Sequence, residues 1–248
     1  MQPPFWADCR QCQRLAGFLD EVKLRHPDYH ARPVPAFGDV EPKLLVIGLA
    51  PGMHGANRTG RPFTGDFAGI LLYRTLYKFG FASREEAASA DDNLRLMKCR
   101  ITNAVKCLPP GNKPEPGEIR QCNGYLATEI ADFKEGGGAA LLALGAIAHQ
   151  AALMALGLKF KSFPFAHGAI HALSGELALD DGLKSGSLTL YDSYHCSRYN
   201  TQTRRLTPNM FEQVFAKICA DLASAELAPD QATQLTTQPA TQPQQTGN

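Results

Sequence analysis

Hydrophobic and polar positions along the chain alternate between strand-like and helix-like patterns. Short apolar runs predict strands at 44–48, 100–105 and 139–144, and residues 169–173 and 187–191 read as two more strands around a Gly/Asp-rich turn region. Longer amphipathic segments predict helices at 9–25, 67–79, 117–134, 145–156 and 208–223. This order predicts an α/β fold, a three-layer sandwich with a central, mostly parallel four-stranded sheet flanked by helices.

One local signal adds a short helix to this picture. Ser83 and Glu86 have the spacing of a capping box, which predicts a helix directly after Ser83.

Composition places the chain among ordinary soluble proteins. Of its 248 residues, 44% are hydrophobic and 20% are charged, and no apolar run reaches the ~18 residues that span a bilayer. The first residues show neither a basic start nor an apolar stretch, so no signal peptide is expected and a cytoplasmic location is predicted. From about Ser224 the chain is dominated by Ala, Gln, Thr and Pro. We therefore predict one domain over 1–223 and a disordered polar tail over 224–248.

The net charge of +1 does not by itself identify a partner, but the cations are clustered. Residues 93–114 contain five cations and no acid, and Arg198, Arg204 and Arg205 form a second basic group. Such patches are able to meet phosphates, although on charge alone an ordinary solvated surface is the favoured explanation.

A glycine-rich loop from Gly48 to Asp66 follows the first predicted strand and is the richest candidate for chemistry. Glycine lets the backbone approach a ligand closely, and Phe63 and Asp66 in this loop offer a ring and a carboxylate. Asn103 and His195 also lie at the ends of predicted strands, and in a parallel sheet such positions share one crevice. The alternatives are that Phe63 is a core residue and Asp66 caps the next helix.

Structural roles would also explain the other two residues. Asn103 would then be a hydrogen-bonded amide at the end of a strand, and His195 would be a structural histidine. The loop lacks both G-x4-G-K-[ST] and G-x-G-x-x-G, so a nucleotide cofactor is not indicated.

Four cysteines are spaced as two pairs. Cys9 and Cys12 form a C-x2-C unit, and Cys107 and Cys122 lie far downstream. Disulfides are not expected in a cytoplasmic chain, whereas two such pairs are able to converge on one zinc ion or one iron–sulfur cluster.

These motifs resemble the uracil-DNA glycosylase superfamily. The likeness rests on GLAPG…GANRTGRPFTGD, TNAVKCLPP, the four cysteines and the His195 loop, and it covers about residues 5–222. Leu49 follows Gly48, which is similar to family 5, the iron–sulfur UDGb type, whereas family 4 has glutamate there. Two positions depart from the family: Cys196 stands where it has proline, and Arg204 stands where it has glycine.

The resemblance implies an enzyme, a monofunctional uracil-DNA glycosylase that hydrolyses the N-glycosidic bond of uracil, and of hypoxanthine and xanthine, after base flipping in base excision repair. It implies catalytic roles for Asp66 and His195. The implied base-binding residues are Gly48, Gly52, Phe63 and Asn103, the implied phosphate contacts are Arg58, Arg61, Arg198, Arg204 and Arg205, and the implied ligands of a [4Fe–4S] cluster are Cys9, Cys12, Cys107 and Cys122.

Zinc is the less favoured occupant of the cysteine site. A monomer that acts on DNA containing deaminated bases, is nucleoid-associated and has no membrane contact is expected. Two rival functions are a non-catalytic DNA-damage-binding iron–sulfur protein and an electron-transfer protein built around the cluster.

Overall fold

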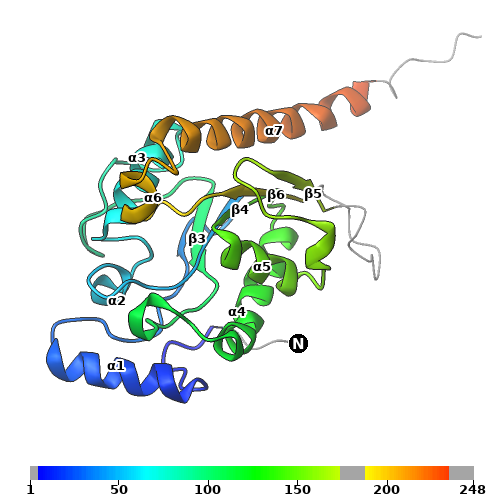
Figure 1. The fold of residues 1–248 in the computed structure, drawn as a ribbon. Helices are drawn as coiled ribbons and strands as arrows, with labels where there is room; N and C mark the ends of the chain where they lie inside the picture. Colours follow the sequence, from blue (N-terminus) through cyan, green and yellow to red (C-terminus); the bar gives the residue numbers. More distant parts are fainter. Residues whose placement is uncertain (1–4, 174–187, 235–248) are drawn as a thin grey trace, which may run out of the picture.

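The computed structural model describes residues 5–173 and 188–234, and these form layers around one mixed sheet (Figure 1). The sheet has six strands in the order β1-β3-β2-β4-β6-β5. Their bounds are β1 Phe37–Gly38, β2 Leu44–Gly48, β3 Cys99–Asn103, β4 Ala140–Leu144, β5 Ile170–Ala172 and β6 Thr189–Ser193. Strands β3, β2, β4 and β6 are parallel, and β1 and β5 add antiparallel edges.

The predicted four-stranded sheet therefore corresponds to the parallel centre, and the full sheet is larger. Strand β1 has only two residues, which is too short to produce a pattern in the sequence. The region at 169–173 was predicted as a strand and is confirmed as β5, but it lies antiparallel at the edge beside β6.

Helices cover both faces of the sheet (Figure 1). The helices are α1 Gln13–Arg25, α2 Ala56–Thr59, α3 Phe67–Lys78, α4 Pro116–Glu135, α5 Ala146–Ala155, α6 Arg198–Gln202 and α7 Pro208–Gln234, with short 3-10 turns at Pro110–Asn112 and Phe160–Ser162. Alternate residues of β2 point to opposite faces. Val46 packs in the cluster formed with α3 and α7, and Ile47 packs in the cluster formed with α4 and α5. The three-layer architecture is confirmed.

Helix α1 lies outside these layers, next to the loop that follows β3. Its Leu15 packs with Val105 and Tyr125, and its Leu19 and Val22 pack with Leu108. The helix begins at Gln13 and not at residue 9 as predicted, and Cys12 directly before it has an extended backbone. This arrangement brings the two cysteine pairs to the same region of the fold.

Two local predictions differ from the structure. The short helix after Ser83 is absent, because the Ser83 hydroxyl accepts a hydrogen bond from Arg95 N–H, 2.9 Å away, instead of capping a helix. Helix α7 continues past residue 223 to Gln234, since alanines such as Ala223 and Ala225 are strong helix formers. The division into a domain over 1–223 and a tail over 224–248 stays a prediction, and 235–248 lies outside the described residues.

The helices in the described part of the chain include none that is long and apolar enough to cross a membrane.

Candidate active site

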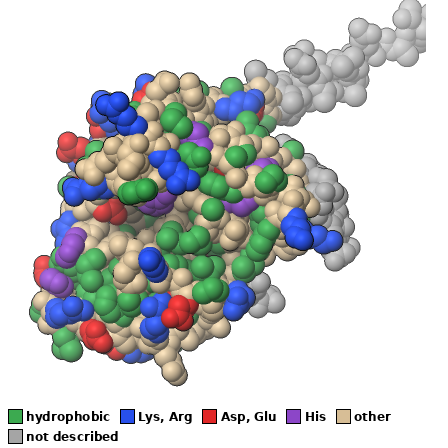
Figure 2. All heavy atoms as spheres, in the orientation of Figure 1, with side chains coloured by type: hydrophobic (Ala, Val, Ile, Leu, Met, Phe, Trp, Pro, Cys, Tyr) green, Lys and Arg blue, Asp and Glu red, His purple; other side chains and the backbone are tan. Residues whose placement is uncertain are grey.

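A cavity of about 310 Å³ opens where the parallel strands end, and it brings the predicted residues together. Its lining includes all four of the side chains expected there, namely Phe63, Asp66, Asn103 and His195, together with Gly52. They come from the loop after β2, from the end of β3 and from the loop after β6. Figure 2 shows a hollow in this face of the molecule, with basic and histidine side chains around it. The predicted crevice is confirmed as a cavity.

Gly48 forms the base of this arrangement at the last position of β2. A Cβ atom there would overlap the Asn103 amide oxygen and would lie 2.6 Å from the Phe63 ring. Any other residue at this position would push the ring and the amide apart. Gly48 therefore sets the spacing between the two groups without lining the cavity itself.

Phe63 is held in a strained backbone conformation. Its backbone angle φ is +53°, a value that residues other than glycine rarely adopt. The Tyr73 hydroxyl donates to Pro62 O at 2.8 Å, and a Cβ at Gly69 would overlap the Phe63 carbonyl, so helix α3 packs directly on this turn. The ring is 6% exposed, and its centroid lies 5.9 Å from that of His195. The ring is thus both part of the core and a wall of the cavity.

Asp66 uses its two carboxylate oxygens differently. Oδ1 accepts from Gly69 N–H at 2.8 Å and caps helix α3, which confirms the capping alternative. Oδ2 lies beside the glycine backbone, where a Cβ at Gly55 would come within 2.5 Å of it. Burial raises the pKa of Asp66, and the hydrogen bonds from the Gly69 and Ala68 N–H groups partly oppose this shift. The same side chain therefore caps the helix and faces the cavity.

Asn103 is 3% exposed at the end of β3, and its Oδ1 has no hydrogen-bond partner among the described residues. An unpaired buried acceptor costs about 1–3 kcal/mol. The side chain lines the cavity, while this oxygen lies against the backbone of Gly48.

His195 lies just past β6, and its main-chain oxygen accepts from Asn200 Nδ2 at 2.8 Å. Burial lowers the pKa of His195 to about 4, because the charged imidazolium is poorly solvated there. The ring is therefore neutral near pH 7 and offers one N–H donor.

The two departures from the family pattern are accommodated locally. Cys196 is fully buried in the same core as Phe211 and Phe215. Arg204 adopts φ +58°, a region where glycine carries no penalty, so the turn keeps a glycine-type shape with arginine in it.

The predicted arginines fall into two groups. Arg198, Arg204 and Arg205 are exposed around the loop after β6, and Arg198 and Arg205 lie over the rings of neighbouring aromatic residues. Arg58 is half-buried and donates to His54 O at 2.7 Å.

Arg61 does not fit the prediction of a phosphate contact, and for this residue the prediction is wrong. Its side chain is 4% exposed and pairs with Asp92, with the closest N–O distance 2.6 Å. It also lies over the Phe37 ring at 4.8 Å. This arginine fixes the glycine-rich loop to the segment around Asp92, and the same pairing holds the pKa of Asp92 well below its usual range.

The four predicted metal-ligand cysteines line one small pocket beside α1 and the loop after β3. They are Cys9, Cys12, Cys107 and Cys122. Cys122 Sγ accepts from Lys106 N–H at 3.3 Å. Four thiolates around one space suit either zinc or an iron–sulfur cluster.

The sequence missed two polar residues that line the main cavity, Asn112 and Ser197. Asn112 sits in the short turn after β3 with φ +56°, and its place in a Gly-Asn pair within a proline-rich loop is the signal that could have pointed to it. Ser197 caps helix α6 and follows the predicted His195 by two positions.

Comparison with known proteins agrees with this geometry. A family model described as the uracil DNA glycosylase superfamily matches residues 35–219. The chain is 45% identical over 211 residues to the type-5 uracil-DNA glycosylase of Thermus thermophilus, covering 83% of this chain and 90% of that protein. It is 38% identical over 217 residues to that of Mycobacterium tuberculosis, covering 84% and 75%.

A third relative is the type-5 uracil-DNA glycosylase of Pyrobaculum aerophilum. It is 35% identical to this chain over 218 residues, which cover 86% of this chain and 89% of that protein. The chain therefore belongs to the uracil-DNA glycosylase superfamily and, within it, to the type-5 uracil-DNA glycosylases.

Proposed function

We propose that this protein removes uracil from DNA by hydrolysing its N-glycosidic bond, as the first step of base excision repair. The observation that carries the proposal is the single cavity in which Phe63, Asp66, Asn103 and His195 meet. A ring, a carboxylate, an unpaired amide oxygen and a neutral imidazole are the groups needed to stack a base, read its edge and stabilise both products of bond cleavage.

The cavity supports recognition of an everted base. Stacking on an aromatic ring such as Phe63 contributes about 1–3 kcal/mol per base. The Asn103 amide carries both an acceptor and donors, so it is able to pair with a base edge that offers both N–H and C=O. The base must leave the helical stack to reach this depth, which costs a few kcal/mol and least for a mispaired base. We therefore include base flipping in the proposal.

The same cavity supports a wider range of deaminated bases. Its volume of about 310 Å³ falls at the lower end of the usual ~300–1,000 Å³ for ligand pockets. Hypoxanthine and xanthine share with uracil an adjacent N–H and C=O, which the Asn103 amide is able to read. We propose that both are substrates besides uracil.

Asp66 and His195 divide the chemistry between the sugar and the base. As the bond breaks, positive charge develops on the sugar and negative charge on the base. The ionised Asp66 carboxylate would stabilise the sugar cation and orient the attacking water, since the neighbouring Leu49 offers only an apolar surface to this cavity. Neutral His195 would donate its N–H to the base oxygen that becomes anionic, an interaction of about 2.7–4 kcal/mol.

The exposed arginines support contact with the DNA backbone. Arg198, Arg204 and Arg205 surround the loop that carries His195, and Arg58 lies at the glycine-rich loop. Pairing of these cations with phosphates would release counterions, so binding would weaken as salt rises. We propose that the protein acts as a monomer on DNA and is found at the nucleoid.

The cysteine site supports a structural cluster. Cys9 and Cys12 precede α1, whereas Cys107 and Cys122 belong to the loop after β3 and to α4, so a shared group would fix α1 to the strand that ends in Asn103. We propose a [4Fe–4S] cluster, as the resemblance to the iron–sulfur glycosylase families implies, with zinc as the less favoured occupant because four thiolates suit both groups. When bound, such a cluster would supply a structural cross-link between α1 and the loop after β3.

Anaerobically purified protein is expected to contain four iron and four sulfide per chain and to be brown. Cys107→Ser should reduce the iron content to a small fraction and expose α1 to proteolysis, whereas Cys219→Ser, which changes a cysteine outside the pocket, should keep it. Metal analysis and visible absorption give the result. Colourless protein with one equivalent of zinc in this pocket would reject the cluster.

Asp66→Asn should lower the single-turnover rate of uracil release by about 10²–10⁴-fold while leaving DNA affinity unchanged. Asparagine also caps helices well, so the start of α3 should be preserved. The measurement uses duplexes that carry uracil, hypoxanthine, xanthine or mismatched thymine, with alkaline cleavage of the abasic product, and Glu85→Gln serves as the matched control. Full activity in Asp66→Asn would remove Asp66 from the mechanism. Binding without base release by the wild type would favour the non-catalytic alternative.

The rate of base release should fall on acidification because Asp66 must be ionised. Its pKa is raised, so the loss should begin above the usual range of an aspartate, and the rate should be flat at higher pH, where Asp66 is ionised and His195 is neutral. Single-turnover rates with enzyme in excess, from about pH 5 to about pH 9, test this. The residual activity of Asp66→Asn should lack this acid limb. An unchanged limb in the variant would assign it to another group.

A further inference from the structure

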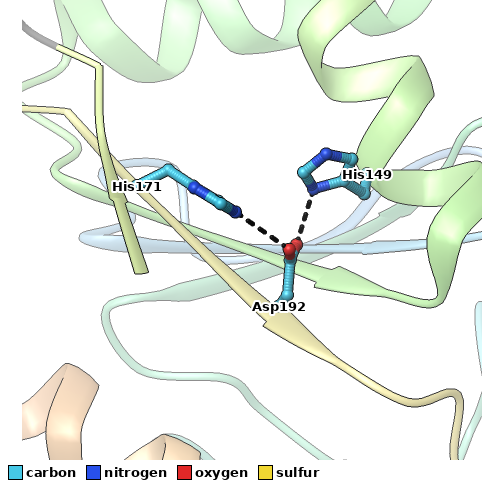
Figure 3. A group of neighbouring side chains, drawn as sticks. All are labelled: His149, His171 and Asp192. Atoms are coloured by element: carbon cyan, nitrogen blue, oxygen red, sulfur yellow. Dashed lines mark hydrogen bonds and ion pairs between the residues drawn. The ribbon is translucent and has the colours of Figure 1, made fainter. Parts of the chain in front are cut away.

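A second polar cluster lies within the fold, away from the cavity and from the cysteines. His149 of α5, His171 of β5 and Asp192 of β6 point toward one another (Figure 3). His149 Nδ1 lies 2.7 Å from Asp192 Oδ1, and His171 Nε2 lies 3.1 Å from Asp192 Oδ2. The side chains of His149, His171 and Asp192 are 2%, 11% and 0% exposed. The proposed glycosylase chemistry uses none of these residues.

The geometry of this cluster is that of a metal site. One atom from each residue, two imidazole nitrogens and one carboxylate oxygen, lies within 4.8 Å of the other two. Bonds of about 2.0–2.2 Å to nitrogen and oxygen would place such atoms about 3.4 Å apart around a tetrahedral ion. The His149 and Asp192 atoms, which lie 2.7 Å apart, would therefore move apart by about 0.7 Å, and any ligand atoms as far apart as 4.8 Å would move closer together. In the described part of the chain, this is the one group of three or more candidate ligands that is so compact.

Neighbouring groups hold the histidine rings in the way that metal-binding histidines are usually held. His149 Nε2 lies 2.8 Å from the main-chain oxygen of Phe163, so this nitrogen donates and Nδ1 is directed at Asp192. Metal-bound histidines typically donate their second nitrogen to a carbonyl or a carboxylate in this way. The Phe163 and Phe165 rings pack against His171 and His149 and keep the cluster dry.

We propose that His149, His171 and Asp192 bind one divalent transition-metal ion of the zinc class. Two imidazoles and one carboxylate suit Zn²⁺ better than Mg²⁺ or Ca²⁺, which prefer oxygen ligands. The three side chains are almost completely buried, and none of them lines any of five cavities that the described residues would offer to a substrate, so the role that we assign to the ion is structural.

The ion would join elements that surround the loop of the active site. Asp192 lies in β6, three positions before His195, and Gly145, which starts α5, donates its N–H to Ser193 O at 2.8 Å. An ion at the cluster would therefore fix the end of β6 between α5 and β5. The alternative is a hydrogen-bonded triad without metal, in which the His149 ring lies between the Asp192 carboxylate and the Phe163 oxygen.

The test uses full-length protein that has retained any group on its cysteines. The protein is washed with EDTA, incubated with excess zinc sulfate, desalted and analysed for zinc by mass spectrometry, and the zinc coordination is read by X-ray absorption. We expect one zinc per chain with only nitrogen and oxygen neighbours at about 2.0–2.2 Å, without sulfur at about 2.3 Å. His171→Gln, at an edge strand, should weaken zinc binding at least about tenfold. The matched control His26→Gln, at a histidine outside the cluster, should bind as the wild type does.

Absence of bound zinc, zinc with sulfur neighbours, or zinc binding unchanged by His171→Gln would overturn the proposal and leave the hydrogen-bonded triad. Because the coordination is measured on the wild type, the outcome does not depend on how the variant folds. Neither the zinc content nor the zinc coordination depends on glycosylase activity, so this result is separate from that of the base-release assays.

Discussion

The site depends on backbone that carries no side chain where other groups must meet. At Gly48 a Cβ would overlap the Asn103 amide, at Gly55 it would come within 2.5 Å of the Asp66 carboxylate, and at Gly69 it would overlap the Phe63 carbonyl. These glycines lie at the end of β2, in the following loop and in α3. The ring, the amide and the acid therefore converge because three backbone segments pack in direct contact, and this packing also supports the positive φ of Phe63. The motif GLAPG…TGD is long because it must supply both the glycines at these close contacts and the side chains that pack against them.

Burial then separates the roles of the two titrating groups. It raises the pKa of Asp66 and lowers that of His195, so each group is pushed toward its neutral form. For His195 the neutral form is the useful one, since it donates a hydrogen bond without placing a charge beside the sugar cation. Asp66 works in the opposite direction, because it must be ionised. The Gly69 and Ala68 N–H groups at the start of α3 partly offset the cost of that charge, so capping the helix and preparing the carboxylate are one interaction.

The sequence was sufficient for features that repeat or that sit in a specific motif. The apolar strands of the parallel centre, the cavity side chains and the gathering of four cysteines followed from pattern and spacing. The predictions that failed concerned partners distant in the sequence or elements too short to form a pattern. Arg61 looks like a loop cation until Asp92 is placed beside it, and β1 is too short to show a period. His149 lies in an apolar helix and meets Asp192 only because α5 packs on β6, so no local signal marks that cluster.

The most direct test of the account is a crystal structure of the Asp66→Asn variant bound to a duplex that contains uracil. The account predicts that the uracil is out of the helix and inside the cavity, stacked on Phe63, with its edge within hydrogen-bond distance of the Asn103 amide and an oxygen beside His195. A uracil that remains stacked in the duplex, or that binds elsewhere while these four side chains contact only protein, would contradict it.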